Sequence, residues 1–402
     1  MPLLSLWKSN PEAVLQFNIE QVVATAGDGK LKDFSVCSQE LHTYLTQVPS
    51  DKLGEYAEHC LTDSFNKSGL VLQDVVNELG RRLDYQVENG RYQGVIGGIG
   101  YDGIWSSPES SDIVVEVKTT DAYRIPLDTI ATYRNKLTTS GKLQSAASIL
   151  IIVGRGETGE LEAQVRGSRH AWDMRLISVD ALVKLVELKE ATEAGVTGAK
   201  IRSILVPMEF TRLDTLVDVL FTAAKDVETT VESEAPVAAE ADESMASASS
   251  SPQSTDPQML AERRGRILAS LDKRDETKLV KRSRALYWDA SHKYRVACTI
   301  SKRYEKKGAS AYWYAYHPNW DAFLKAGEVS YLALGCIDMK VSFVLPLAVI
   351  QRHLTELSTT NKEDVVQYWH LKIFEHDTGV FTLQLPKSGN QLSLKEFTVP
   401  MT

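Results

Sequence analysis

The chain has 402 residues, of which 43% are hydrophobic and 24% charged, as expected for a globular protein of two or three domains. No run of about 18 apolar residues is present, which argues against a membrane span, and the N-terminus lacks the pattern of a signal peptide. The four cysteines are scattered without a CxxC pair, which gives no zinc pattern and suits a reducing compartment. We therefore expect a cytoplasmic protein that does not associate with membranes.

The net charge of −8 is unevenly distributed along the chain. Residues 226–261 contain eight acids and no bases, whereas residues 262–402 contain 22 bases and 15 acids. A basic C-terminal region is compatible with nucleic-acid binding, and it is equally compatible with a solvated surface of mixed sign.

The first 190 residues divide into two zones. Residues 1–65 have apolar positions at helical spacing and are predicted to form a helical N-terminal segment. Residues 66–190 then give a helix over 70–83, followed by several short strands and then by helices and strands in alternation. The predicted strands cover 85–87, 92–96, 100–105, 113–119, 148–153 and 175–179, and the later helices cover 125–137, 159–172 and 181–188. This order indicates an α/β domain with a mixed sheet, extended to residue 225 by one or two helices over 204–224.

The segment 226–261 is rich in Ser, Ala, Glu and Pro and has few large apolar residues, so it is predicted to be a flexible linker. After it, a basic helix is predicted over 259–279. Aromatic and β-branched runs such as YRVACTI, SYLALGCI and YWHLKIF follow. They indicate a separate α+β domain with an antiparallel sheet over 262–402.

The stretch GYDGIWSSPESSDIVVEVKTTD carries the clearest chemistry. Side chains alternate along a strand, so Glu116 and Lys118 project to one face while Val115 and Val117 project to the other. Three apolar residues precede Glu116, which predicts a central, buried strand. A buried acid and lysine are costly unless they are used, and a short connection would bring Asp102 beside Glu116.

Asp102, Glu116 and the carbonyl oxygen of Val117 would offer hard oxygen ligands. Mg²⁺ suits such a set, because it retains several waters and takes one or two carboxylates; Mn²⁺ is expected to substitute. A metal ion there can activate water and neutralise charge on a phosphate. Lys118 can orient the attacking water or stabilise the phosphorane as a compact charge on a long arm. The alternative is that Glu116 and Lys118 simply pair on the surface of an edge strand.

This arrangement resembles the PD-(D/E)xK nuclease superfamily, whose restriction endonuclease-like core has the order αβββαβ. The resemblance covers roughly residues 66–190 and implies that Asp102 and Glu116 are the metal acids and Lys118 the catalytic lysine. Tyr101 replaces the family's proline.

The resemblance also implies further site residues. Many members add an acid from the first core helix, for which Glu78 is the best match and Asp74 the second. The helix after the motif often adds a substrate-binding residue, and Tyr133 is in position, with Thr129 where one branch of the family has Gln.

A cluster of bases follows in QVRGSRHAWDMR. Arg166 and His170 lie four residues apart, on one face of the predicted helix, with Arg169 beside them. These three residues are candidate phosphate contacts, and an ordinary solvated helix explains them equally well.

The C-terminal region has a basic start, with 15 bases and 5 acids between Arg263 and Lys307, followed by the aromatic run AYWYAYHPNW. Alternation places Tyr312, Tyr314 and Tyr316 on one face and Trp313 on the other. Aromatic rings near bases can stack on or cage a nucleobase. We favour the alternative that most of these rings fill the core.

We therefore expect a Mg²⁺-dependent endonuclease that hydrolyses DNA, with the C-terminal domain supplying recognition or regulation. By analogy, a nuclease joined to a separate module suggests restriction or anti-invader defence, in which a homodimer and a partner protein are plausible. The alternatives are a non-catalytic nucleic-acid-binding protein on a nuclease fold and a nuclease that acts on RNA or repair intermediates.

Overall fold

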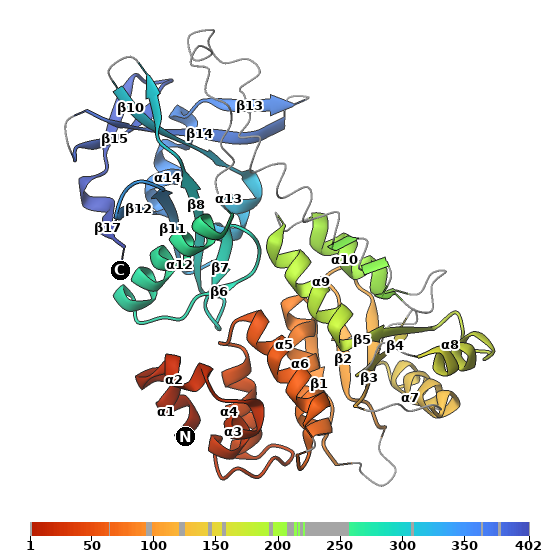
Figure 1. Ribbon diagram of the computed structural model, residues 1–402. Coiled ribbons are helices and arrows are strands. Elements are labelled where there is room, and N and C mark those ends of the chain that lie inside the picture. The colour runs from red at the N-terminus through yellow and green to blue at the C-terminus, as the bar shows by residue number, and fades with distance from the viewer. Residues whose placement is uncertain are drawn as a thin grey trace. The chain divides into compact units, whose positions relative to one another are not determined.

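The computed structural model divides the chain into two compact units, Met1–Ala224 and Lys225–Thr402, which are drawn from red to yellow-green and from green to blue in Figure 1. The structure describes residues 2–63, 65–93, 99–119, 125–143, 147–154, 158–192, 196–206, 213–214, 216–217, 220–221, 257–306, 309–362, 365–376 and 379–401. Most of the predicted linker 226–261 therefore lies outside the described residues.

The first unit begins with short helices whose starts are fixed by polar caps. The Asn18 side chain accepts a hydrogen bond from the Gln21 backbone amide, and the Gln21 side chain accepts one from the Asn18 backbone amide. At the next helix, the Ser35 side chain accepts a hydrogen bond from the Ser38 backbone amide. These helices are α1 (Pro2–Ser9), α2 (Pro11–Leu15), α3 (Ile19–Thr25), α4 (Val36–Leu45) and α5 (Ser50–Thr62).

The rest of this unit alternates between strands and helices, which confirms the predicted α/β class. Its strands are β1 (Gln86–Asn89), β2 (Gly103–Ser106), β3 (Asp112–Lys118), β4 (Ser148–Val153) and β5 (Met174–Ser178). Its helices are α6 (Ser68–Arg82), α7 (Leu127–Thr139), α8 (Gly159–Arg166), α9 (Val179–Ala191) and α10 (Val196–Leu205).

The five strands form one mixed sheet in the order β1-β2-β3-β4-β5. The pairs β1–β2 and β2–β3 are antiparallel, whereas β3–β4 and β4–β5 are parallel. The strand β3 therefore occupies the centre of the sheet, at the junction between its antiparallel and parallel halves. The prediction that the DIVVEVK strand is central and buried is confirmed.

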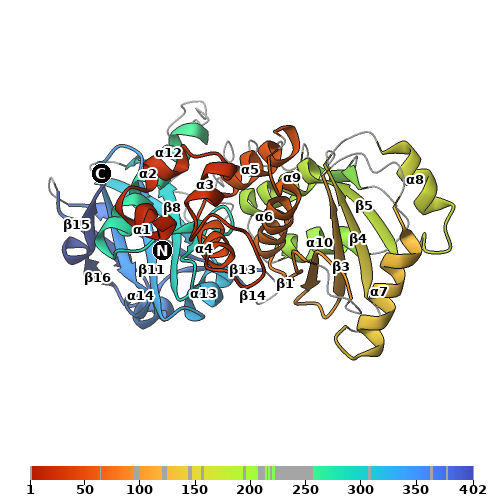
Figure 2. The same cartoon turned by 90° about the horizontal axis from the view of Figure 1, so that it is seen from below.

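Each face of this sheet is covered by helices (Figure 2). Ile113 and Val115 of β3 pack in one core cluster with α6, α9 and the N-terminal helices. Val114 of β3 packs in the other cluster, with α7 and α8. The N-terminal helices share the first cluster with α6. The predicted boundary at residue 65 therefore does not divide two separate hydrophobic cores.

Two element predictions in this unit need correction. The predicted helix 159–172 ends at Arg166, and a turn leads from Gly167 into β5, because Gly167 and Ser168 favour leaving the helix. In the predicted strand 92–96, Tyr92 and Gln93 form a bend rather than a strand, and residues 94–96 lie outside the described residues.

The second unit has two sheets rather than the single antiparallel sheet predicted. One sheet contains β17 (Thr398–Pro400), β12 (Val341–Pro346), β11 (Val329–Cys336), β8 (Tyr294–Ser301), β7 (Leu286–Trp288) and β6 (Val280–Lys281), in that order. The other contains β16 (Asn390–Ser393), β15 (Phe381–Leu385), β14 (Val365–Glu375), β10 (Ala309–Tyr316) and β9 (Tyr304–Lys306), with β13 (Thr359–Lys362) also paired to β14. The strands β8 and β11 pair in parallel. Parallel strands need a long crossover connection, and the chain between these two contains β9, β10 and the helix α13 (Pro318–Lys325).

The main core of this unit lies between the two sheets. Tyr312, Tyr314 and Tyr316 are at most 1% exposed and belong to this core, so the expectation that most rings of this run are core residues is confirmed. The Tyr314 hydroxyl donates to the Gly335 carbonyl at 2.9 Å, which ties one sheet to the other. The helix α14 (Leu347–His353) follows β12.

A second, smaller core lies on the opposite face of the β8–β11 sheet, under the helix α12 (Pro257–Arg274). The helix α12 begins before residue 261, so the predicted linker must end by Pro257, whose fixed φ favours the first turn of a helix. Among the residues that the structure describes, no helix is both long and apolar enough to cross a bilayer.

Candidate active site

The structure brings Asp102, Glu116 and Lys118 together at the end of the central strand. Asp102 immediately precedes β2, and the register pairs Gly103 with Val115. Asp102 therefore stands next to Glu116, at the end of the sheet where β2 begins and β3 continues past it. Strand alternation places Glu116 and Lys118 on the same face as Val114, which is the face covered by α7.

The carboxylate of Asp102 is fixed by the backbone of β3. Its Oδ2 accepts the amide hydrogen of Val117 at 2.7 Å. The N–H and C=O of one strand residue point to the same neighbour, so the Val117 carbonyl also points toward the side of Asp102. The Lys118 carbonyl accepts from the Gly154 amide at 3.0 Å and so points the other way, toward β4.

The backbone of Asp102 is held as firmly as its side chain. Its carbonyl oxygen accepts the side-chain amides of Gln73 at 3.0 Å and Asn77 at 2.9 Å, both from α6, and the Gly90 amide at 2.9 Å. This approach depends on glycine, since a Cβ on Gly103 would lie 2.2 Å from Asn77 Oδ1. The helix α6 thus positions Asp102 through two buried amides.

Burial and the neighbouring charge make the Asp102 carboxylate hard to ionise. Burial first, and then the charge of Glu116, raise the pKa of Asp102 to about 6. The Val117 hydrogen bond and the charge of Lys118 oppose this shift only in part. The site therefore has negative charge that its own cation does not fully compensate.

That cation is Lys118, whose Nζ contacts Glu116 Oε1 at 2.5 Å. The side chains of Glu116 and Lys118 are 16% and 32% exposed, so both are accessible from one side. Glu116 and Lys118 therefore form the ion pair that the alternative interpretation predicted, but they lie on a central strand and not on an edge strand.

The donor set fits a divalent cation. Two adjacent carboxylates with incompletely compensated charge, together with the Val117 carbonyl, are the oxygen ligands that Mg²⁺ or Mn²⁺ takes beside waters. Within the described ranges, no three His, Cys, Asp or Glu side chains gather as a metal site, so a cation here would rely on two side chains and a carbonyl.

Glu78 is not brought into this cluster. It lies in α6, on the opposite face of the sheet, and its carboxylate pairs with Arg82 at 3.0 Å and Arg81 at 3.4 Å. Arg82 in turn donates to the carbonyls of Leu45, Thr46 and Val48 beyond the end of α4. The contacts of Glu78 are therefore those of a buried structural ion pair.

Asp74, the second choice for an acid on this helix, belongs to another network. Its carboxylate accepts the Tyr92 hydroxyl at 2.5 Å and contacts His42 Nε2 at 2.9 Å. The Asn89 amide contacts the same His42 nitrogen at 3.0 Å. Asp74 is 1% exposed and is thus satisfied within the protein.

The predicted phosphate contacts have partners of their own. Arg166 pairs with Glu162 at 2.6 Å, while Arg169 and His170 both contact Asp128, the second residue of α7, at 2.8 and 2.7 Å. These bonds lower the pKa of the exposed Asp128 carboxyl, with the His170 bond as the largest cause. Arg169 and His170 thus tie the turn after α8 to the start of α7.

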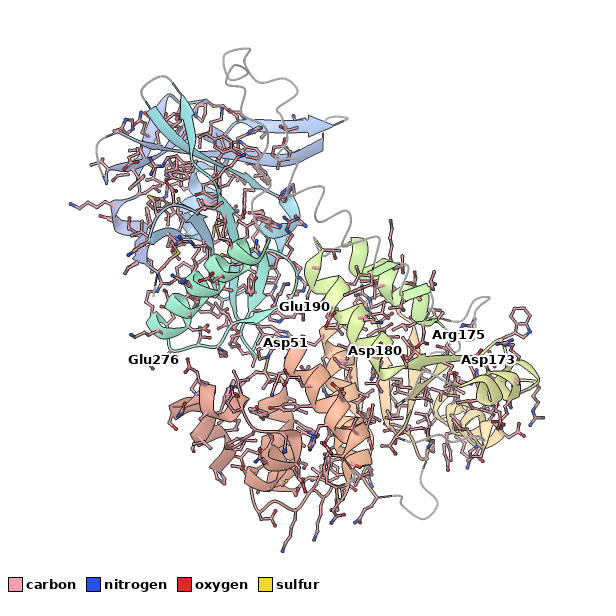
Figure 3. All side chains as sticks on the ribbon, viewed as in Figure 1. Asp51, Asp173, Arg175, Asp180, Glu190 and Glu276 are labelled. Atoms are coloured by element: carbon pink, nitrogen blue, oxygen red, sulfur yellow. The ribbon has the colours of Figure 1, made fainter. Side chains whose placement is uncertain are left out.

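Arg175, the fourth base of that run, is structural. It is the second residue of β5, lies near Asp173 (Figure 3) and is only 1% exposed. Its Nη1 donates to the carbonyls of Met174 at 2.7 Å and Ala171 at 3.3 Å. Burial lowers the pKa of its guanidinium, which suits a turn-stabilising residue better than a phosphate contact.

Tyr133 lies close to the candidate site. It is half-buried on α7, and a Cβ on Gly100 would lie 3.2 Å from its ring. Its ring therefore packs on the chain two residues before Asp102.

Gln73 and Asn77 were not predicted as site residues. Their signal is a pair of polar residues four apart in the stretch LVLQDVVNEL, each followed by an acid and separated by apolar residues, which marks a polar stripe on one helix face.

No family model and no curated protein matches this chain.

Proposed function

We propose that the Met1–Ala224 unit is a metal-dependent nuclease of the PD-(D/E)xK type, with a restriction endonuclease-like core, and that it hydrolyses phosphodiester bonds in DNA. The observation that carries the proposal is the cluster of Asp102, Glu116 and Lys118 at the end of β3, beside the start of β2. The mixed sheet order and the placement of α6 and α7 on opposite faces support it.

In this proposal, Asp102, Glu116 and the Val117 carbonyl hold Mg²⁺ or Mn²⁺. The bound cation would neutralise charge on the scissile phosphate and make a water easier to deprotonate. Val117 holds Asp102 through its amide, while Gln73 and Asn77 hold its backbone. Lys118, on its flexible stem, orients the attacking water or stabilises charge on the phosphate oxygens.

The proposal is tested by cleavage of supercoiled plasmid with Mg²⁺ or Mn²⁺. We expect nicking or linearisation by the wild type, and a loss of about 100-fold or more in Asp102→Asn and Lys118→Ala. Lys136→Ala, which changes an exposed lysine on α7, is the matched control and should cleave as the wild type does.

Direct Mn²⁺ titration separates metal binding by the two carboxylates from the proposed catalytic role of Lys118. Asp102→Asn and Glu116→Gln should weaken Mn²⁺ binding, whereas Lys118→Ala should bind the ion at least as well, because it removes the cation that occupies Glu116. Equal cleavage by all variants, or cleavage in the presence of a chelator, would contradict the proposal. Parallel assays on single-stranded DNA and RNA decide the substrate.

The biological role proposed is defence against invading DNA, which rests on the analogy with nucleases joined to a separate module.

A further inference from the structure

The outer face of the β9–β10–β14 sheet in the second unit is rich in aromatic side chains. Strand alternation places the odd-numbered residues of β10 and the even-numbered residues of β14 on this face, away from the core between the sheets. We call it the aromatic face; its partly exposed rings are Tyr304, Trp313, His317, Tyr368, His370 and Phe374.

The rings at the centre of the aromatic face form one connected group. Tyr368 lies edge-on to Trp313, with ring centroids 6.1 Å apart, and 5.1 Å from His370. It also lies 5.7 Å from His317. Ala311 and Ala315 flank Trp313 along β10, so its neighbours on that face of its own strand are small side chains.

A hydrogen-bond chain fixes the orientation of these rings. The Trp313 Nε1–H can only donate, and it donates to His370 Nδ1 at 3.0 Å. His370 must then carry its proton on Nε2, which contacts Thr360 Oγ1 at 2.8 Å. Burial and the nearby Lys372 lower the pKa of His370, in keeping with this neutral form. The indole is therefore held in place before any ligand arrives.

The charge of the aromatic face is positive. Lys372 is the cross-strand neighbour of Trp313, and Lys302 lies 5.5 Å from the centre of the Tyr304 ring. Among the described residues that alternation places on this face, none is Asp or Glu. Arg303, in contrast, is paired with Asp338 and Glu375 and adds no uncompensated charge.

We propose that the aromatic face binds single-stranded nucleic acid, with bases stacked on Trp313 and Tyr368 and phosphates near Lys302 and Lys372. Unpaired bases present flat rings that stack on such side chains, and the phosphates complement a face that has lysines and, among its described residues, no acids. The face belongs to the unit that does not contain Asp102, so the inference does not depend on the nuclease proposal.

The test is binding of the full-length protein to a labelled oligothymidine of about 20 nucleotides, followed by fluorescence anisotropy. A chelator is present throughout, so that neither cleavage nor a metal ion contributes. We expect Trp313→Ala and Tyr368→Ala each to weaken binding by about tenfold or more, which is the loss typical of one stacked base. Trp313→Phe, which keeps a ring, should retain most of the affinity.

The lysine contribution is measured through salt dependence. Lys372→Ala should reduce the slope of log affinity against log salt by about 0.7, the value for one phosphate contact on a single strand. Trp313→Ala should lower affinity and leave this slope unchanged. The matched controls are Lys387→Ala, at an exposed lysine of the same unit, and Trp172→Ala, at an exposed tryptophan of the other unit. Both should bind as the wild type does.

Circular dichroism must show that each variant is folded. Because stacking needs unpaired bases, Trp313→Ala should weaken binding of a duplex of the same sequence much less than binding of the single strand, whatever affinity the other unit has for duplex DNA. A parallel titration with oligouridine shows whether DNA or RNA is preferred. Unchanged affinity in folded Trp313→Ala and Tyr368→Ala, an equal loss of affinity for the duplex in Trp313→Ala, or no binding of either strand would overturn the proposal. Self-association that Trp313→Ala abolishes, without strand binding, would instead assign the face to a second copy of the chain.

Discussion

At the scale of single residues, the candidate site depends on where each carboxylate finds its partner. Asp102 receives one backbone amide and faces Glu116, whereas Glu78 receives two arginines. The Glu78–Arg82 pair has the spacing of a helical ion pair, so the sequence already contained a structural explanation for Glu78. The partners of Asp102 could not be predicted from sequence spacing, because they lie in β3 and α6, far from Asp102 along the chain.

The raised pKa of Asp102 predicts a pH-dependent effect of Asp102→Asn on stability. The folded pKa, about 6, lies above the ordinary value of 3.8, so the wild type loses stability as pH rises between these values. In a chelator, Asp102→Asn should therefore melt several degrees above the wild type at about pH 7.5 and close to it at about pH 4.

Thermal melts at the two pH values check this expectation. Added Mn²⁺ should then reverse the order, because only the wild type retains both carboxylates. Asp180→Asn, at an exposed residue at the start of α9, is the control and should change the melting temperature little. A variant that melts below the wild type at neutral pH would mean that Asp102 is stabilised in its charged form.

Glu78 gives a prediction that separates stability from activity. Glu78→Ala leaves the buried Arg82 without its carboxylate, so we expect it to lower the free energy of unfolding by about 3 kcal/mol. Glu78→Gln keeps a hydrogen-bond acceptor and should cost less. Well below the melting transition, both variants should retain plasmid cleavage within a few-fold of the wild type. Urea denaturation measures the stability of each variant, and plasmid cleavage measures its activity. Loss of cleavage in a stable Glu78→Gln protein would mean that Glu78 takes part in catalysis.

At the scale of elements, the site depends on the close approach of α6 to β2. The order of strands and helices in the first unit followed from apolar periodicity, since β3 contains the apolar run Ile113–Val115 and β4 is apolar after Ser148, and only a central position can bury such strands. The approach of α6 was not predictable, because it requires Gly80 and Gly103 to face specific partners. A Cβ on Gly80 would lie 2.5 Å from the Trp105 ring, and the sequence does not reveal such pairings.

Gly103→Ala tests this approach. The added methyl group would collide with Asn77 Oδ1, which accepts from Trp105 Nε1, so we expect a loss of about 1–3 kcal/mol in stability. Cleavage should fall as well, because Asn77 also holds the Asp102 carbonyl. Gly159→Ala, in a helix where a Cβ meets nothing within 4 Å, is the matched control and should be neutral or stabilising. Equal stability of the two variants in urea denaturation would contradict this account.

At the scale of the whole molecule, each unit has a hydrophobic core of its own. The composition of the intervening acidic segment indicated this division, since it has too few apolar residues to form a core. The two-sheet arrangement of the second unit was not predicted. Its strands have the same apolar character in either sheet, and the parallel pairing of β8 with β11 depends on a crossover that strand patterns alone do not show.

Limited proteolysis tests this division. A protease specific for glutamate should cleave first within residues 226–256, which contain five glutamates and no base. Mass spectrometry should then find two resistant fragments, one for each unit, and each should retain a cooperative thermal transition. First cleavage inside either unit, or loss of structure in both fragments, would show that the units do not fold independently.

The hydrogen bond between Val117 and Asp102 also gives the protein a built-in spectroscopic reporter. The Val117 amide donates to a side-chain carboxylate rather than to a strand carbonyl, so its NMR chemical shift depends directly on the charge of Asp102. One backbone resonance would then follow protonation of Asp102, the binding of a cation and the effect of each substitution, without a probe attached to the candidate site.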